Sequence, residues 1–225
     1  MTAFRKKLVS EIGRKHISQH PFYRLWKEGK LSIEHLQTYA KQYHKFVRSF
    51  PRFVASVYSS CHDADTRRRI LGNLIEEETG NFEKPHDELW LQFAEALAVK
   101  KKHVILSEEF KETNEAVKAF ESLSKKSLIE GAACLLSYEF QIPEIARLKK
   151  EGLKKFYGIK GKKSLEFFDK HQEVDIEHSK VWLDLLEKFA RTKGDRRAAI
   201  KSLRQGLEAQ WLLLDGVMKN IDVAC

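Results

Sequence analysis

The chain has 225 residues, of which 41 are Lys or Arg and 32 are Asp or Glu, for a formal net charge of +9. This length suffices for one domain over residues 1–225 with a sizeable core. No stretch reaches the roughly 18 apolar residues of a membrane span, and the charged first segment is unlike a secretory signal, so a cytoplasmic protein without a membrane partner is expected.

The excess positive charge comes from lysines concentrated at residues 100–102 and 149–163. They fall in expected loops or on solvated helix faces without a nucleic-acid motif, so nucleic acid is not an expected partner. The three cysteines, Cys61, Cys134 and Cys225, are odd in number and lack metal-ligand spacing. They indicate free thiols in a reducing compartment rather than a disulfide framework.

Helix-forming residues dominate, with only 4 Pro and 11 Gly, and alternating strand patterns are scarce. These features predict an all-α fold of about eight helices. The expected helices cover about residues 3–15, 33–61, 63 or 65 to 79, 85–99, 113–123, 127–155, 164–190 and 196–219, with a short piece at 21–27. Pro51 and Pro143 lie inside two of them, where a proline predicts a kink.

The apolar stripe of the expected helix 164–190 is interrupted by polar residues. It consists of Leu165, Phe168, His171, Asp175, His178, Trp182, Leu185 and Phe189. His171, Asp175 and His178 follow the i, i+4, i+7 spacing, which places their side chains within a sector of roughly 60° on one helix face. A single inward histidine is usually an ordinary core residue, whereas three ionisable groups together are typical of metal ligands.

Other expected helices repeat this pattern. Glu139 interrupts the stripe of segment 127–155, Glu77 follows Ile70 and Leu74, and His86 begins the stripe of segment 85–99. A buried isolated carboxylate costs several kcal/mol, so three inward carboxylates and three imidazoles require compensating cations. Six such ligands from four helices suit two ions of iron, manganese or zinc, about 3.5–4 Å apart. The alternative is a metal-free hydrogen-bond network.

Four motifs resemble the TenA/PqqC superfamily, and within it the CADD branch of death-domain-associating proteins. They are EEETG at 76–80, PHDELW at 85–90, SYEFQIPEIAR at 137–147 and HQEVDIEH at 171–178. The resemblance implies a haem-oxygenase-like helical fold. It implies metal ligands at Glu77, His86, Glu139, His171, Asp175 and His178, the residues that the stripes had selected. The link before His86 is about two residues longer than the family pattern, which leaves Glu76 and Glu78 open as alternatives to Glu77.

The resemblance also implies a reaction in folate biosynthesis, the formation of para-aminobenzoate by a dinuclear iron or mixed iron/manganese centre that uses dioxygen and a reductant. The segment HPFYRLWKEGKL matches the family's tyrosine-bearing region. Tyr23 would supply the aromatic ring and Lys149 the amino group, both consumed, with Tyr39 and Tyr43 as relays. By residue type alone, Tyr23 would be a buried phenol and Lys149 a surface lysine. A straight helix would hold Lys149 about 15 Å from Glu139, so a bend at Pro143 is required.

Two alternative functions use other features of the chain. Cys134 and Tyr138 form a C-x3-Y pair that is similar to the nucleophile region of TenA thiaminases, although this cysteine lies among apolar residues and such an enzyme has no need of the histidine-rich helix. The second alternative is a non-enzymatic helical module that binds a death domain or another protein. The family resemblance further implies a homodimer.

Overall fold

The computed structural model describes residues 1–81 and 83–221, so Cys225 lies outside the described residues. The helices are α1 (Ala3–Arg14), the 3-10 turn η1 (Ile17–Gln19), α2 (Pro21–Glu28), α3 (Ile33–Val47), α4 (Phe50–Ser60), α5 (Ala64–Thr79), α6 (His86–Ala96), α7 (Lys101–Ile105), α8 (Lys111–Ser124), α9 (Leu128–Glu139), α10 (Ile142–Phe156), α11 (Lys162–Phe189) and α12 (Lys193–Lys219). The described residues contain no strand, which confirms the all-α prediction.

Two helices that were expected to be long and kinked are each divided in two. The first ends at Val47 and restarts at Phe50, and the second ends at Glu139 and restarts at Ile142. Pro51 and Pro143 occupy the first turn of the new helix in both cases. A proline lacks the N–H that would reach the carbonyl four residues earlier, and those carbonyls belong to Val47 and Glu139, where the helices end. The prediction of a kink was therefore wrong, because each proline begins a separate helix.

Other boundaries differ by a few residues. The expected helices at 113, 164 and 196 begin two or three residues earlier, at Lys111, Lys162 and Lys193. A capping box between Thr192 and Asp195 forms the start of the last of these helices. The helix expected to reach residue 99 ends at Ala96, before the positive φ of 62° at Ala98. The short elements η1 and α7 were not expected, because single turns carry little periodicity.

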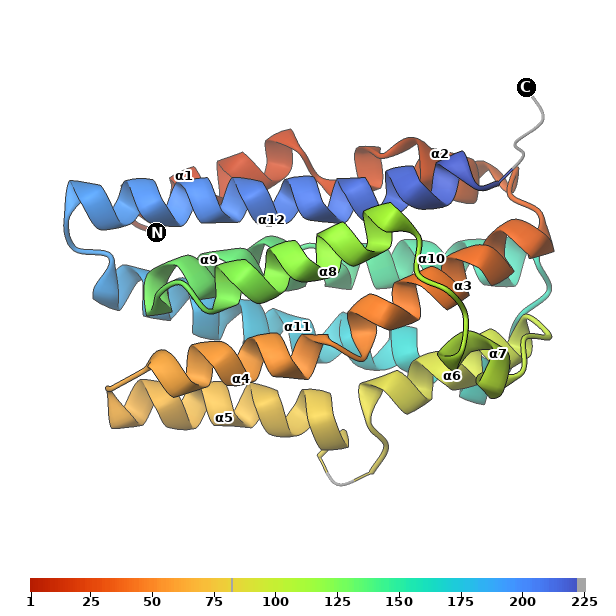
Figure 1. Ribbon diagram of the computed structural model, residues 1–225, viewed down its shortest axis with the longest axis horizontal. Helices are drawn as coiled ribbons and strands as arrows, with labels where there is room; N and C mark the ends of the chain where they lie inside the picture. Colours follow the sequence, from red (N-terminus) through yellow and green to blue (C-terminus); the bar gives the residue numbers. More distant parts are fainter. Residues whose placement is uncertain (82, 222–225) are drawn as a thin grey trace.

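The long helices run roughly along the longest axis of the molecule (Figure 1). Helix α9 lies in the interior, since every residue from Gly131 to Glu139 is buried, and it packs against α4, α8, α11 and α12. The contact with α12 is close: a Cβ at Gly206 would lie 2.3 Å from Ser137 Oγ. The end of α9 therefore delivers Glu139 into the centre of the bundle, opposite α11.

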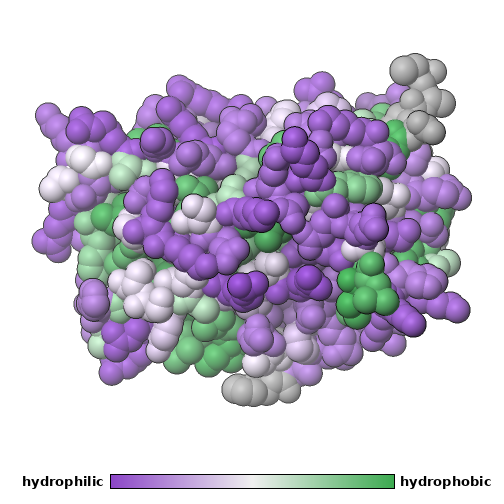
Figure 2. Space-filling view, in the orientation of Figure 1, coloured by the Kyte–Doolittle hydropathy of each residue, from purple (hydrophilic) through white to green (hydrophobic). Residues whose placement is uncertain are grey.

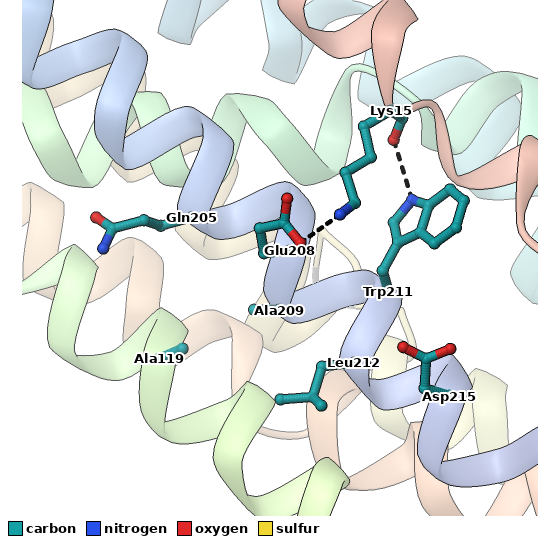
Figure 3. A pocket seen from close by; sticks show the side chains of 8 residues that line it. All are labelled: Lys15, Ala119, Gln205, Glu208, Ala209, Trp211, Leu212 and Asp215. Carbon is teal, nitrogen blue, oxygen red and sulfur yellow. Dashed lines mark hydrogen bonds and ion pairs between the residues drawn. The ribbon is translucent and has the colours of Figure 1, made fainter. Parts of the chain in front are cut away.

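Hydrophilic side chains cover most of the face in Figure 2, and a separate hydrophobic area lies over α7, where Ile105 and Leu106 are exposed. A surface hollow of about 370 Å³ lies beside α12 and is lined by residues that include Lys15, Glu208 and Trp211 (Figure 3). In the described part of the chain, no helix is both long and apolar enough to cross a membrane.

Candidate metal centre

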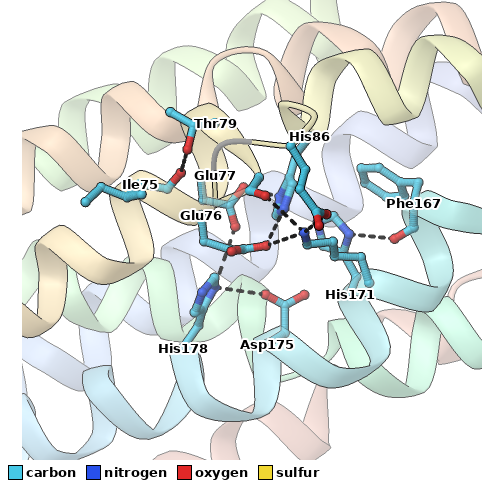
Figure 4. Close-up of polar contacts among 12 residues, drawn as sticks. Ile75, Glu76, Glu77, Thr79, His86, Phe167, His171, Asp175 and His178 are labelled. Carbon is cyan, nitrogen blue, oxygen red and sulfur yellow. Dashed lines mark hydrogen bonds and ion pairs between the residues drawn. The ribbon is translucent and has the colours of Figure 1, made fainter.

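The six residues expected to be ligands meet in the interior, at the junction of α5, α6, α9 and α11. We call them the buried cluster; Figure 4 labels five of them. Their residue exposures are 5 % for Glu77, 1 % for His86, 0 % for Glu139, 3 % for His171, 0 % for Asp175 and 5 % for His178. The buried cluster thus brings together residues that lie up to 101 positions apart in the sequence, from 77 to 178.

The buried cluster divides into two groups whose potential ligand atoms all lie within 4.8 Å of one another. One group contains Glu77, His86 and His171, and the other contains Glu77, Glu139, Asp175 and His178. Glu77 belongs to both groups, as a carboxylate between two adjacent cations would. The two groups that could each hold a metal ion therefore have one carboxylate in common.

Several polar atoms of the cluster have no hydrogen-bond partner among the described residues. These atoms are Glu139 Oε1, both carboxylate oxygens of Asp175 and His178 Nδ1. An unpaired buried polar group costs roughly 1–3 kcal/mol, and more when it is charged. Oxygen and imidazole donors that converge without hydrogen bonds fit divalent metal ions, which would satisfy them.

The pKa shifts within the cluster also favour the binding of cations. Burial raises the pKa of Glu77, but the three cluster histidines outweigh this effect and bring it to about 2. Burial lowers the pKa of His86 and His178, yet the carboxylates raise them to about 10 and about 9. In the metal-free cluster, protons on these imidazoles balance the buried acids. A bound metal would displace those protons, because a ligating imidazole must be neutral.

Two contacts orient ligand atoms toward the centre. Nδ1 of His171 lies 2.7 Å from the carbonyl oxygen of Phe167, to which it donates its proton, and this leaves Nε2 free. The indole N–H of Trp182 donates to Oε2 of Glu139, which leaves Oε1 free. Such outer hydrogen bonds fix the tautomer and the rotamer of metal ligands. The sequence placed Trp182 on the same helix face as the ligands but gave no sign of its role as a donor.

The turn after α5 decides which glutamate faces the cluster. Gly80 adopts φ +57°, and a Cβ there would lie 2.0 Å from the carbonyl oxygen of Lys84, so only glycine permits this tight return to His86. Glu78 is exposed, whereas Glu77 is buried and reaches Nδ1 of His86 at 2.8 Å. Glu76 is also buried but belongs to neither group. The geometry thus favours Glu77 among the three candidates.

Lys149 is buried rather than on the surface, with 2 % exposure, which corrects the expectation from residue type. Its Nζ lies over five rings, which we call the aromatic cage: Tyr43 at 4.6 Å from the centroid, Tyr39 at 5.1 Å, Trp90 at 5.4 Å, Tyr23 at 5.6 Å and Phe168 at 5.7 Å. Burial holds the pKa of Lys149 well below its ordinary value, which favours the neutral amine. The break between α9 and α10, rather than a bend, gives Lys149 its separate direction.

Four buried tyrosines extend from the cage to the cluster. The hydroxyls of Tyr23 and Tyr39 lie 3.3 Å apart, the rings of Tyr39 and Tyr43 are 5.1 Å apart, and Tyr43 donates to the hydroxyl of Tyr138 over 3.0 Å. Tyr138 directly precedes Glu139. Sequence reasoning did not assign Tyr138 to this site, although it belongs to the SYE motif. Burial raises the pKa of all four phenols, which therefore keep their protons.

The comparison with known proteins agrees with this geometry. The family described as "Iron-containing redox enzyme" matches residues 37–211, a range that contains the whole buried cluster. The chain belongs to this family. It is 37 % identical to a 4-aminobenzoate synthase of Nitrosomonas europaea, over 96 % of this chain and 92 % of the relative.

Solved structures show the same haem-oxygenase-like fold. A TenA homologue from Pseudomonas syringae matches with a TM-score of 0.83 at 15 % identity, covering 96 % of this chain and 93 % of its own. A CADD-like protein from Nostoc punctiforme matches with a TM-score of 0.77 at 17 % identity, covering 97 % and 99 %. These structures confirm the predicted fold, and the family match together with the 4-aminobenzoate synthase relative confirms the superfamily and an enzyme of the iron-containing redox family.

The thiaminase alternative lacks support in this family member. Cys134 lies on α9 with 0 % exposure, and burial raises the pKa of its thiol well above the usual value. Nucleophilic attack requires the thiolate, which this apolar position disfavours. Cys134 is best described as a small core residue beside α12.

One hollow of about 270 Å³ leads toward the buried cluster. Glu77 lines it together with Val47, Arg48 and Pro51, which lie at the break between α3 and α4. The hollow of Figure 3, in contrast, is lined by none of the expected site residues. Glu77, the carboxylate shared by the two groups, therefore lies at the wall of this hollow.

Proposed function

We propose that this enzyme forms 4-aminobenzoate, the para-aminobenzoate of the sequence-based expectation, by oxidising its own Tyr23 beside a dinuclear metal centre. The observation that supports this most directly is a buried amine, Lys149, enclosed by tyrosine rings beside a buried cluster suited to metals. The relatives named 4-aminobenzoate synthase support the product. The chain itself would be consumed in the reaction.

The two groups of ligands differ in chemistry, which bears on the metals. The group of His86 and His171 is rich in imidazole, and the group of Glu139, Asp175 and His178 is rich in carboxylate. Imidazole suits iron, whereas carboxylates also suit manganese. Either two irons or an iron beside the imidazoles with a manganese beside the carboxylates fits this donor set. When bound, these ions would supply the redox chemistry that couples dioxygen and a reductant to oxidation of an organic group.

Tyrosine contains the carbon skeleton that the product needs. 4-Aminobenzoate is a benzene ring with a carboxyl carbon para to an amine, and a tyrosine ring has its Cβ para to the hydroxyl. Cβ would become the carboxylate carbon through oxidation and cleavage of the Cα–Cβ bond. Nitrogen would replace the phenol oxygen, which would leave as water when the amine condenses with the oxidised ring. Dioxygen and the reductant supply the oxidising equivalents and the electrons that this conversion needs.

Lys149 is the proposed nitrogen source because burial favours its neutral, nucleophilic form. Transfer of its nitrogen breaks the Nζ–Cε bond. The rings of Tyr39 and Tyr43 lie nearer to Nζ than the ring of Tyr23, at 5.1, 4.6 and 5.6 Å. Distance does not select Tyr23, and its assignment rests on the match of the HPFYRLW segment to the family.

The remaining tyrosines connect Tyr23 to the cluster. The rings of Tyr39 and Tyr43 lie next to each other, tilted by 39°, and so connect the Tyr23–Tyr39 hydroxyl contact with the Tyr43–Tyr138 hydrogen bond. A phenol that loses an electron also gives up its proton, and each hydroxyl here has a phenol neighbour to receive it. We therefore assign Tyr39, Tyr43 and Tyr138 to the transfer of electrons and protons between the cluster and Tyr23.

A single-turnover experiment tests the proposal. Protein loaded with ferrous iron, alone or with manganese, and supplied with reductant and dioxygen should release at most one 4-aminobenzoate per chain. Protein made with ring-deuterated tyrosine should give a deuterated product, and mass spectrometry should find the altered residue at position 23. Tyr23→Phe should release none, whereas Tyr39→Phe should retain some product. Sustained turnover of an added aromatic precursor would contradict self-consumption.

A further inference from the structure

Glu76 is a buried carboxylate that the reaction described above does not use. It is 3 % exposed and lies on α5 beside the buried cluster, next to His86 in Figure 4. Its Oε1 is 3.5 Å from Nε2 of His86 and 3.1 Å from Nζ of Lys170. Neither carboxylate oxygen has an aligned hydrogen bond among the described residues. A buried acid held between an imidazole and an ammonium group calls for an explanation.

The two imidazoles of the imidazole-rich group, His86 and His171, each have one ring nitrogen beside an oxygen atom from outside the buried cluster. His171 points one nitrogen at the carbonyl oxygen of Phe167 and leaves the other free. His86 points Nδ1 at Glu77, the carboxylate shared by both groups, and Nε2 at Glu76. A histidine that binds a metal through one nitrogen usually donates the N–H of the other to an acceptor, and a carboxylate acceptor makes the imidazole more basic.

We propose that Glu76 and Lys170 form a positioning pair for His86, an inference that rests on the proposed dinuclear centre. Glu76 accepts the Nε2–H of His86, which fixes the tautomer and presents Nδ1 to the metal on the side of Glu77. Glu76 itself does not bind metal. The pair therefore strengthens binding at the imidazole-rich position and leaves the carboxylate-rich position unchanged.

Lys170 holds this arrangement in place. Its Nζ donates to the carbonyl oxygen of Gly80 at 3.2 Å and pairs with Glu76, so it fastens the end of α5 to α11. Lys170 also directly precedes His171. Its charge draws Glu76 away from the two groups of the buried cluster, and its position links the Glu76–His86 contact to the second imidazole.

Metal titration of four variants tests the pair without reference to catalysis. Anaerobic titrations with manganese and with ferrous iron should find two equivalents in the wild-type protein. Glu76→Ala and Lys170→Met should still bind two, with the affinity of one site lowered about 10- to 100-fold. Lys170→Arg, which restores the charge, should recover most of the affinity.

Lys84→Met is the matched control. Lys84 pairs with Glu166 at 3.0 Å and also joins the turn after α5 to α11, but it makes no contact with Glu76. It should bind both metals like the wild type, which separates loss of the pair from general loosening of this turn. Thermal unfolding of the metal-free variants checks that each is folded.

Three results would overturn the inference. Wild-type affinities in both Glu76→Ala and Lys170→Met would show that His86 needs no such support. Loss of a whole equivalent from Glu76→Ala at saturating metal would make Glu76 a ligand instead. Equal weakening in Lys84→Met would reduce the effect to packing. A wild-type protein that binds no metal would instead refute the dinuclear centre, and the pair with it.

Discussion

The buried cluster and the aromatic cage bury ionisable groups in opposite ways. In the cluster, carboxylates and imidazoles face one another, and the carboxylates raise the pKa of His86 and His178 to about 10 and about 9 against the effect of burial. In the cage, rings surround Lys149 and burial alone drives its pKa down. The cluster thus retains charge and favours cations, whereas the cage favours a neutral amine.

Aromatic side chains lie between the two regions. The Trp90 ring lies 4.9 Å from that of Tyr43 and 4.9 Å from that of Phe167, which in turn stacks on His171 at 4.0 Å. This aromatic wall separates the amine from the acids, which would otherwise stabilise its protonated form. The contrast in charge between the two regions is therefore built into the packing, and single substitutions should affect one region without the other.

The largest effect is expected from removing two imidazoles of the cluster. The double variant His171→Ala, His178→Ala takes one ligand from each group, so metal content should fall from two equivalents to nearly none and product should disappear. Elemental analysis of protein dialysed against the metal measures this loss. The double variant His62→Ala, His103→Ala removes two exposed histidines and should keep both metals. Full metal content in the first variant would refute the cluster as the metal centre.

Replacing the amine should abolish the product without loss of metal. Lys149→Met keeps the apolar stem in the cage and removes the group that burial destabilises. The free energy of unfolding at pH 7 should rise by about 1–3 kcal/mol, because the buried polar group is gone. Urea unfolding and elemental analysis measure the two quantities. Product release by Lys149→Met would exclude Lys149 as the nitrogen source, and metal loss would contradict the independence of the two regions.

A smaller effect is expected from replacing Trp182, whose indole donates a hydrogen bond to Glu139. Trp182→Phe removes the N–H donor to Oε2 but keeps an aromatic ring, so the affinity of the carboxylate-rich position should fall about 10-fold. Trp211→Phe is the control, since the indole of Trp211 on α12 donates to the carbonyl oxygen of Lys15 at the end of α1, away from the cluster. Competitive titration with a chelator compares the two, and equal affinities would show that Glu139 needs no donor.

The smallest effect is expected from replacing Glu11, a carboxylate that pairs with Arg204 and Lys7 rather than with histidines. Arg204 and Lys7 hold the pKa of Glu11 at about 2, below its ordinary value of 4.5. The unfolded chain therefore takes up this proton first as the pH falls, so the stabilisation is complete above pH 4.5 and is lost from there toward pH 2. Glu11→Gln should show a shallower fall in thermal midpoint between pH 5 and pH 3 in melting curves. An unchanged slope would exclude this contribution.

The chain's periodicity was enough to predict the longer helical segments and the direction of His171, Asp175 and His178, because side chains at three- and four-residue spacing must share a helix face. The same logic placed Glu77, His86 and Glu139 on inward stripes. Prolines 51 and 143 marked two places of disruption. Nothing local distinguished a kink from a break, since that depends on whether the chain beyond the proline finds a partner in a new direction.

The packing of the helices determined the features that the sequence alone did not predict. Lys149 has a long flexible stem that suits a surface or an aromatic interior equally well, and only the approach of α2, α3, α6 and α11 to α10 placed rings around it. Glu77 rather than Glu76 lies in the two candidate groups because the turn at Gly80 returns the chain so that His86 lies beside Glu77, whereas Glu76 pairs with Lys170. The sequence determines which way a side chain points from its own helix, whereas its partners come from helices distant in the chain.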